Sequence, residues 1–194
     1  MITDTEIDVR PLQPELLSDY LAFFDRDAFA DNPRWASCYC FFNHTPRECE
    51  PWDERTGAQN RADAASWVAA GRMRGYLAYS RGKVVGWCNA NLRASYTNLD
   101  ADPELARRRV GAITCFVIAK ACRGRGIARR LLAAACAGFE REGMDFIEAY
   151  PRKDANGEAA NYHGPLAMYL AAGFVPVAEN QGVVVVRKRL EVSA

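Results

Sequence analysis

The sequence predicts a single α/β domain over residues 1–194, with a mixed, mostly antiparallel sheet and helices on both of its faces. Two hairpin patterns indicate antiparallel pairing, one turning around Ser80–Lys83 and one around Asn180–Gly182. The segment GAITCFVIAK is apolar on both alternating faces, as expected of a central strand that is covered on both sides. At 194 residues and 49% apolar content, the chain is long enough for one substantial core, and a second domain is not expected.

The N-terminal part of the chain predicts a strand, two helices and the first hairpin, in that order. A short strand is expected at Ile7–Arg10, and the helical spacing of apolar residues in ELLSDYLAFFD predicts the first helix. The stretch Asp31–Asp53 is rich in Pro, Cys and aromatic residues without a clean period, so it predicts a long connection. The second helix, GAQNRADAASWVAAG, ends at Gly71 before the hairpin, and the polar residues Asn91–Arg109 follow it as a solvated connection.

The C-terminal part alternates strands and helices. The strand in GAITCFVIAK leads through a short turn into RGRGIARRLLAAACAGFEREG, whose apolar residues form one helical stripe and which Gly143 ends. The segment MDFIEAY predicts another strand, and Pro151–Gly164 a polar loop. Pro165 begins a short helix that ends at Gly173, and the second hairpin follows.

Composition excludes several partners. The formal net charge is +1, so no general positive field would hold nucleic acid or an anionic membrane. The start MITDTEIDVRPL lacks the features of a secretory signal, and no apolar stretch of ~18 residues follows, so we expect a soluble, cytoplasmic protein. Seven cysteines form an odd, scattered set, which favours reduced thiols over a disulfide framework.

The segment ITCFVIAKACRGRGIARRLL, Ile113–Leu132, carries the strongest chemical signal. A buried strand stops, two glycines allow a tight turn, and a helix begins with unpaired amides that face the turn, which is a geometry that binds anions such as phosphate. A Walker loop would need Lys and Ser or Thr where Ile127 and Ala128 stand. A dinucleotide fingerprint would need a third glycine where Arg129 stands, and the glycines could also merely form a strand-to-helix turn.

Two motifs together decide between these readings. The pattern R-x-x-G-x-A, met by Arg123, Gly126 and Ala128, directly follows the apolar strand, and MYLAAGFVPV, Met168–Val177, places a Tyr three residues before Gly-Phe. In this order, with MDFIEAY between them, they resemble the acetyl-CoA signature and the closing helix and strand of the GCN5-related N-acetyltransferases, the GNAT family. The resemblance implies the GNAT fold, with acceptor-side helices and the first hairpin in residues 1–109 and an acetyl-CoA-binding core in residues 110–194.

The resemblance also implies the cofactor site. The strand residues Phe116, Val117 and Ile118 would run alongside the pantetheine of acetyl-CoA, the co-substrate, and no metal is expected. The turn that follows would hold the pyrophosphate, and its members are Arg123, Gly124, Arg125, Gly126, Ile127 and Ala128.

The implied reaction is direct attack of a neutral primary amine on the thioester. It needs donors for the developing oxyanion, a route for the amine proton and an acid for the departing thiolate. Main-chain N–H groups near Val117 and Ile118 would serve the oxyanion, and Tyr169 occupies the place of the family's thiolate-protonating tyrosine. Glu148 is the candidate base, and His163 is a second candidate in the loop before the last helix.

The stretch WASCYCFFNH raises a separate question on the acceptor side. Cys38, Cys40, His44 and Cys49 have the ligand types of tetrahedral zinc, but their spacing lacks the paired knuckles of recognisable zinc sites, and C-x-C is a poor redox pair. If the stretch is extended, alternate residues share a face. This predicts an aromatic wall for the acceptor pocket, made by Trp35, Tyr39, Phe41 and Trp52, with plain hydrophobic packing as the alternative.

The expected acceptor is the amine of a small molecule or a peptide, and neither nucleic acid nor a membrane is expected as a partner. A homodimer is common in the family that the sequence resembles. Two other functions stay open: a non-catalytic acyl-CoA-binding sensor, and a zinc-binding protein that uses the cysteine and histidine set described above.

Overall fold

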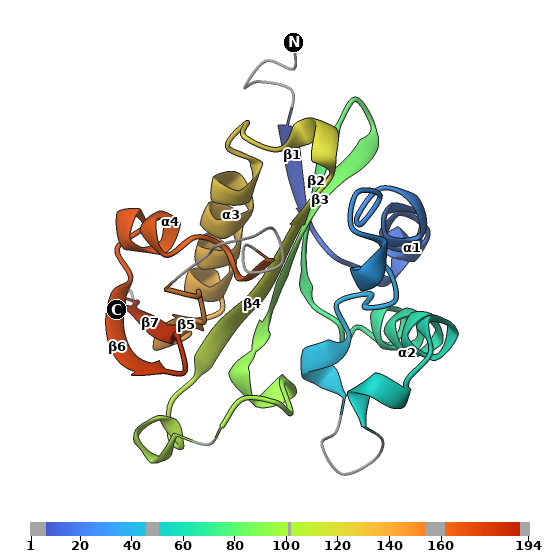
Figure 1. Cartoon of the computed structure of the whole chain (residues 1–194). Helices are drawn as coiled ribbons and strands as arrows, with labels where there is room; N and C mark the ends of the chain where they lie inside the picture. Colours follow the sequence, from blue (N-terminus) through green and yellow to red (C-terminus); the bar gives the residue numbers. More distant parts are fainter. Residues whose placement is uncertain (1–6, 46–50, 101, 154–161, 191–194) are drawn as a thin grey trace.

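The computed structural model describes residues 7–45, 51–100, 102–153 and 162–190, and a seven-stranded sheet lies at its centre (Figure 1). The strands lie in the order β1-β2-β3-β4-β5-β7-β6. Each described neighbouring pair is antiparallel except β4 and β5, which run parallel, so the predicted mixed, mostly antiparallel sheet is confirmed. The strand bounds are β1 Ile7–Pro11, β2 Gly75–Ser80, β3 Lys83–Leu92, β4 Val110–Ile118, β5 Phe146–Ala149, β6 Val175–Asn180 and β7 Val183–Arg189.

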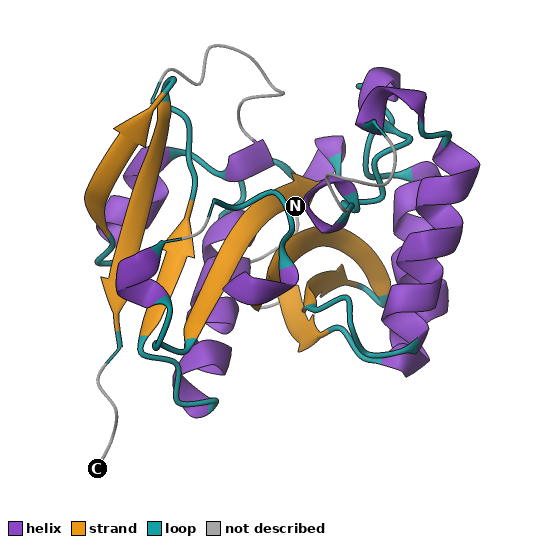
Figure 2. Ribbon diagram, turned by 90° about the horizontal axis from the view of Figure 1, so that it is seen from below, coloured by secondary structure: helices purple, strands orange, loops and turns teal. Residues whose placement is uncertain are grey.

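Helices cover both faces of the sheet (Figures 1 and 2). The helices α1 Leu17–Arg26 and α2 Gly57–Ala69 pack on one face, and α3 Ile127–Arg141 and α4 Leu166–Ala171 on the other. Two apolar clusters result, one on each side of the sheet, which explains why β3 is buried along nearly its whole length. Among the described helices, none combines the length and apolar character needed to cross a bilayer.

The connection between α1 and α2 is irregular, as predicted. It contains the short 3₁₀ helices Pro33–Trp35, Phe42–His44 and Trp52–Glu54. The helix α2 then begins with a capping box, because the Thr56 side chain accepts from the Gln59 amide while the Gln59 side chain accepts from the Thr56 amide. In its described residues this connection contains no strand, and it reaches the middle of the sheet, where Asn89 of β3 donates to the Cys40 carbonyl at 3.1 Å.

The strands β4 and β5 separate beyond a short parallel stretch. Their pairing runs from Val110 opposite Phe146 to Ile113 opposite Ala149, where β5 ends. The strand β4 continues to Ile118, so its last residues have no paired strand on the β5 side in the described part of the chain. The sheet is consequently open along one edge of β4, close to its centre.

A β-bulge marks the point where this opening starts. Against β3, Cys115 pairs with Asn89 and Ile113 pairs with Ala90, so Thr114 is the extra residue. A bulge re-aims side chains locally. Thr114 and Cys115 accordingly line the same pocket, although they are consecutive residues of one strand.

Candidate functional site

The open edge of β4 presents main-chain groups to the separation between β4 and β5. The carbonyl oxygen of Thr114 accepts a hydrogen bond from His163 Nδ1 at 3.1 Å, and the carbonyl oxygen of Ile118 accepts one from Arg123 Nε at 3.1 Å. Main-chain groups of alternate strand residues point to the same side. Phe116, midway between these two residues, therefore directs its N–H and C=O into the opening.

The main-chain groups of Val117 point the opposite way, toward β3, which corrects the prediction that Val117 flanks the pantetheine. The amide of Ala119, two residues further on, donates to the Val85 carbonyl of β3 at 3.0 Å, so the odd-numbered residues direct their main-chain groups toward β3. The Val117 side chain is fully buried in the cluster under α1 and α2. Of the three strand residues predicted to flank the pantetheine, Phe116 and Ile118 are thus oriented for main-chain contact, and Val117 is not.

The glycine-rich turn has the expected geometry. Gly124 and Gly126 adopt φ angles of 73° and 74°, and a Cβ placed on either would meet no atom within 4 Å. Both glycines are exposed, and α3 begins immediately after them at Ile127. Because the first amides of a helix have no partner within it, the N–H groups from Arg125 to Ala128 face an open space that suits a phosphate group.

The side chain of Arg123 is engaged elsewhere. Its guanidinium donates to the two carboxylate oxygens of Asp31 at 2.7 and 3.0 Å, in addition to its bond with the Ile118 carbonyl. The same arginine lowers the pKa of the Asp31 carboxyl below 3.8. Arg123 therefore joins the end of β4 to the segment after α1, and only the loop that follows it is open to a ligand.

Tyr169 is buried beside the opening. Its ring is fully buried against Phe116 and Phe174, and its hydroxyl donates to the His163 carbonyl at 2.8 Å. Burial raises the pKa of Tyr169 well above 10, so the hydroxyl carries its proton at neutral pH. The hydroxyl thus fixes the main chain of the loop that carries His163.

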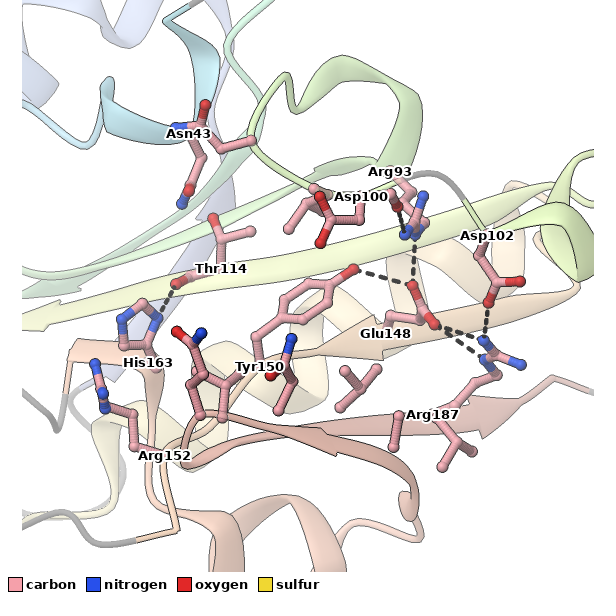
Figure 3. A pocket seen from close by; sticks show the side chains of 18 of the residues that line it. Asn43, Arg93, Asp100, Asp102, Thr114, Glu148, Tyr150, Arg152, His163 and Arg187 are labelled. Atoms are coloured by element: carbon pink, nitrogen blue, oxygen red, sulfur yellow. Dashed lines mark hydrogen bonds and ion pairs between the residues drawn. The ribbon is translucent and has the colours of Figure 1, made fainter. Parts of the chain in front are cut away.

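Glu148 is the centre of a buried ion-pair network (Figure 3). Its side chain is buried, and one oxygen accepts from Arg187 at 2.8 and 3.0 Å. The other oxygen accepts from Arg93 at 2.6 Å and from the Tyr150 hydroxyl at 2.9 Å. A carboxylate offers about four lone-pair positions, so these four contacts leave it without an acceptor position for an amine proton.

Two pockets meet at the open edge of β4. The first, here called the polar pocket, has a volume of about 690 Å³ and is lined by the Glu148 network, by Asp100 and Arg152 and by residues of β6 and β7 (Figure 3). The second, the aromatic pocket, has a volume of about 470 Å³ and is walled mainly by the connection between α1 and α2. Three residues line both pockets: Asn43, Thr114 and His163.

The predicted acceptor residues divide into two groups. Trp35 and Trp52 line the aromatic pocket, together with Phe42 and Tyr162. Tyr39 and Phe41 do not line it, because both are buried in the cluster under α1 and α2. The prediction that these last two face the pocket is wrong.

The reason lies in the backbone of the WASCYCFFNH stretch. Tyr39 and Cys40 adopt left-handed φ angles of 44° and 50°, and the segment forms successive turns, with the amide of Phe41 bonded to the Cys38 carbonyl. The alternation of an extended strand therefore does not apply. Cys38 and Cys40 face the aromatic pocket instead, and the hydroxyl of Tyr39 donates to Asp25 at 2.7 Å.

His44 is part of the core. Its Nδ1 donates to the Ser95 carbonyl at 3.1 Å, its Nε2 accepts from Asn89 at 3.4 Å, and its ring stacks on Tyr96. Both ring nitrogens are thus used within the protein. Cys49, the fourth residue of the zinc hypothesis, lies outside the described residues, and within the described ranges no three His, Cys, Asp or Glu residues are placed to hold a metal ion.

Sequence reasoning missed three residues of this region. Thr114 gains its position from the bulge, and Asn43 and Asp31 come from the irregular connection, which has no period. Only Thr114 had a partial signal in the sequence, because it is a lone hydroxyl residue in an apolar strand. Tyr162 was also missed, and its ring contacts Phe29 and Trp35 in the aromatic pocket.

Comparisons with known proteins agree with this geometry. The family model described as "Acetyltransferase (GNAT) family" matches residues 32–168. A GNAT-family acetyltransferase from Listeria monocytogenes superposes with a TM-score of 0.58 at 16% identity, over 95% of this chain and 95% of that chain. The search of curated proteins gave no match.

Two further structures were determined with coenzyme A. PaiA N-acetyltransferase from Thermoplasma acidophilum, in complex with coenzyme A, has a TM-score of 0.57 at 10% identity, over 94% of this chain and 98% of that chain. A chain of the NatC complex bound to Gag peptide and CoA has a TM-score of 0.56 at 19% identity, over 96% of this chain and 99% of that chain. At these identities the likeness concerns the fold, and it confirms the predicted fold class.

We expect stability to fall as the pH drops from 6.5 toward 4. Burial lowers the pKa of His44 from 6.5 to about 4. Between pH 6.5 and pH 4 the unfolded chain therefore binds a proton at His44 that the folded chain does not. The linked loss for this one residue is roughly 3 kcal/mol. Urea denaturation of the wild type and of His44→Asn should show a stability gap at neutral pH that narrows as the pH falls. A difference in stability that does not change with pH would contradict a lowered pKa of His44 in the folded protein.

Proposed function

The chain belongs to the GNAT acetyltransferase family, and on this basis we propose that it is an N-acetyltransferase that moves the acetyl group of acetyl-CoA to a primary amine. Family membership supports acyl transfer with acetyl-CoA as the co-substrate. The acceptor and the role of each residue are proposals that rest on the geometry of the opening. The acceptor class is the amine of a small molecule or a peptide.

The observation that carries the proposal is the continuity between the open edge of β4 and the glycine turn. Along the edge Phe116 offers a main-chain N–H and C=O, and Ile118 offers an N–H, because its carbonyl already accepts from Arg123. The exposed turn Gly124–Gly126 lies beyond the end of the edge, before α3. A pantetheine arm can pair with the edge as an added strand would, while the amides from Arg125 to Ala128 hold the pyrophosphate. This order of polar groups fits coenzyme A along its length.

The proposed position of the acetyl group is the start of the opening, beside Thr114. There the thioester carbonyl lies near the main-chain N–H groups of the open edge, which stabilise negative charge as the amine attacks. The bulge at Thr114 brings this point to the junction of the polar and aromatic pockets. An acceptor in either pocket can therefore present its amine to the same carbon.

The two pockets differ in the ligand groups that their side chains can bind. The aromatic pocket offers Trp35, Phe42 and Trp52, of which Phe42 is 45% exposed and Trp35 38% exposed. Such rings bury apolar or aromatic groups of a ligand. We therefore assign the body of the acceptor to the aromatic pocket, which favours a primary amine that carries an apolar group.

Tyr169 remains the proposed acid for the departing thiolate. Its high pKa keeps the hydroxyl protonated, and its ring contacts Phe116 on the open edge. For transfer to the sulfur, the hydroxyl must exchange its bond with the His163 carbonyl for one with the ligand. Glu148, by contrast, is proposed to hold β5, β7 and the segment after β3 together through Arg93 and Arg187, rather than to act as a base.

The first prediction of the proposed function concerns acetyl-CoA binding. At a ligand concentration ~100 times the dissociation constant, linkage stabilises the protein by about 2.7 kcal/mol, so the melting temperature should rise clearly. In Gly126→Ala this shift should be greatly reduced, because a Cβ would enter the space in front of the amides. Gly71→Ala is the matched control, since Gly71 has a similar φ of 66° and equal open space but lies at the end of α2.

Isothermal calorimetry with acetyl-CoA provides the second measurement for the same variants. Absence of binding to the wild type would overturn the proposed function. Binding without release of coenzyme A across a panel of amines would favour the acyl-CoA sensor instead. The panel comprises 2-phenylethylamine, L-phenylalaninamide, an aliphatic polyamine and an aminoglycoside.

The second prediction concerns Tyr169. In Tyr169→Phe, kcat should fall by roughly 10- to 100-fold while the dissociation constant of acetyl-CoA changes little, because the hydroxyl is required in the transition state rather than for binding. Tyr79→Phe also removes the hydroxyl of a buried tyrosine, here one on β2 that donates to Asp19 and lines neither pocket. It should leave kcat unchanged at temperatures below its melting point. Equal kcat in wild type and Tyr169→Phe would make Tyr169 a packing residue.

The third prediction separates a structural Glu148 from a catalytic one. In Glu148→Gln the two arginines lose their shared counter-charge, and the free energy of unfolding should fall by about 3 kcal/mol. Glu179→Gln, which breaks the exposed pair with Lys153, should cost less than about 1 kcal/mol. Measured below its melting temperature, Glu148→Gln should keep the wild-type pH profile of kcat/KM. Loss of the acidic limb of that profile would identify Glu148 as the base.

A further inference from the structure

We infer that His163 is the catalytic base that takes the proton from the attacking amine, and that Thr114 is the residue that positions it. The inference rests on the proposed acetyl transfer and adds the proton acceptor that this reaction lacks. It depends on the tautomer of one ring, on the place of that ring in the cleft and on the charges around it.

The tautomer follows from one hydrogen bond. The Nδ1 atom of His163 lies 3.1 Å from the Thr114 carbonyl oxygen, which can only accept, so Nδ1 must carry the proton. In the neutral ring Nε2 then has a free lone pair. Among the described residues Nε2 has no hydrogen-bond partner, and the ring lines both pockets. Figure 3 shows the ring in the polar pocket, bonded to Thr114.

The ring is also held in place from behind. The hydroxyl of Tyr169 donates to the His163 carbonyl, so α4 fixes the main chain while β4 fixes the ring. Both bonds are made by buried groups, since Tyr169 is fully buried and Thr114 is 2% exposed. His163 is therefore a pre-oriented acceptor rather than a loop side chain free to rotate.

Thr114 adds a second observation at the same point. Its hydroxyl is buried and makes no hydrogen bond of good geometry with a described residue, although Tyr96 lies nearby. Its side chain lines both pockets, next to that of Asn43. An unsatisfied buried hydroxyl costs free energy unless a ligand completes it. A bound amine can accept from this hydroxyl or donate to it while its other proton points to His163 Nε2.

The charges around His163 favour the neutral ring. Burial lowers the pKa of His163 below 6.5, and the positive charge of Arg152, which lines the polar pocket, lowers it further, while the hydrogen bond to the Thr114 carbonyl acts in the opposite direction. Glu148 of β5 and Tyr150, which follows β5, line the same pocket but are bonded to each other. Further titratable neighbours are Cys115 of β4, Tyr162 and Tyr169 of α4. With no free carboxylate described beside the ring, His163 is unprotonated at neutral pH, as a base must be.

The neutral amine nitrogen bonds to the thioester carbon, and one of its protons passes to His163 Nε2. The carbon–sulfur bond then breaks, the coenzyme A sulfur takes up one proton from Tyr169, and the imidazolium of His163 returns a proton to the Tyr169 oxygen through solvent. The products are the N-acetyl amine and the free thiol, and no net proton is released.

The test measures the turnover of acetyl-CoA and 2-phenylethylamine by His163→Asn and by the wild type. If the wild type does not turn over this amine, the other amines of the panel above are used. The Asn side chain can still donate to the Thr114 carbonyl from nearly the place of Nδ1, but it offers no basic nitrogen. We expect kcat to fall by roughly 100-fold, as removal of a general base does, with the melting shift by acetyl-CoA unchanged. Added imidazole should restore part of the rate to this variant and none to Tyr169→Phe.

The pH profile gives a readout that a structural role would not move. With rates calculated on the neutral amine concentration, wild-type kcat/KM should show an acidic limb below pH 6.5, which His163→Asn should lack. Thr114→Val, which removes the hydroxyl but keeps the carbonyl, should raise KM for the amine and retain that limb. An unchanged kcat in His163→Asn, or a limb that survives in it, would overturn the inference while leaving acetyl transfer intact.

A direct measurement covers the case in which the variant does not fold. The chain has two histidines, so the imidazole ¹⁵N spectrum of the wild type contains two rings, which His44→Asn assigns. His163 should be neutral at pH 7, with its proton on Nδ1. A protonated ring, or a proton on Nε2, would overturn the inference. Absence of acetyl-CoA binding and turnover in the wild type would instead refute the proposed function on which the inference rests.

Discussion

The functional region depends on one constraint, the mismatch in length between two parallel strands. The strand β5 ends at Ala149, while its neighbour β4 continues to Ile118. Buried main-chain polar groups must find partners, so an unpaired edge near the centre of a sheet is costly unless something else satisfies it. His163 and Arg123 satisfy the carbonyls of Thr114 and Ile118 at its two ends. The stretch between them, around Phe116, is where a ligand can supply the missing partner.

Much of this arrangement could be predicted from the sequence, because its signals are local. Extended runs joined by short glycine-containing turns predicted the hairpins, and the pair of glycines before α3 predicted a tight turn, which the φ angles of Gly124 and Gly126 bear out. Residues such as Ile127 and Leu131 at helical spacing predicted the buried side of α3. Each of these signals is fixed by the period of its own element.

The parts that could not be predicted depend on register or on irregular backbone. The bulge at Thr114 exists only in relation to β3, and the left-handed conformations of Tyr39 and Cys40 have no signature in residues that carry a Cβ. Those two residues reverse the faces expected of an extended strand. Glu148 is a further case, because its arginine partners lie 55 and 39 residues away in the chain. A carboxylate in a strand beside a cleft looks like a base until its partners are known.

Two sets of ion pairs keep the opening from closing on itself. Arg123 and Asp31 join the turn before α3 to the segment after α1, at the far end of the β4 edge. Glu148 joins Arg93 and Arg187 on the other side of the bulge, so that β5 and β7 stay together where β5 leaves β4. Both sets are partly or wholly buried, and removing one charged partner from such a pair costs far more than removing an exposed one. The separation of the strands is therefore held by charges at its two ends, and the uncharged groups between them, Phe116, Thr114 and His163, are those that we propose contact the ligand.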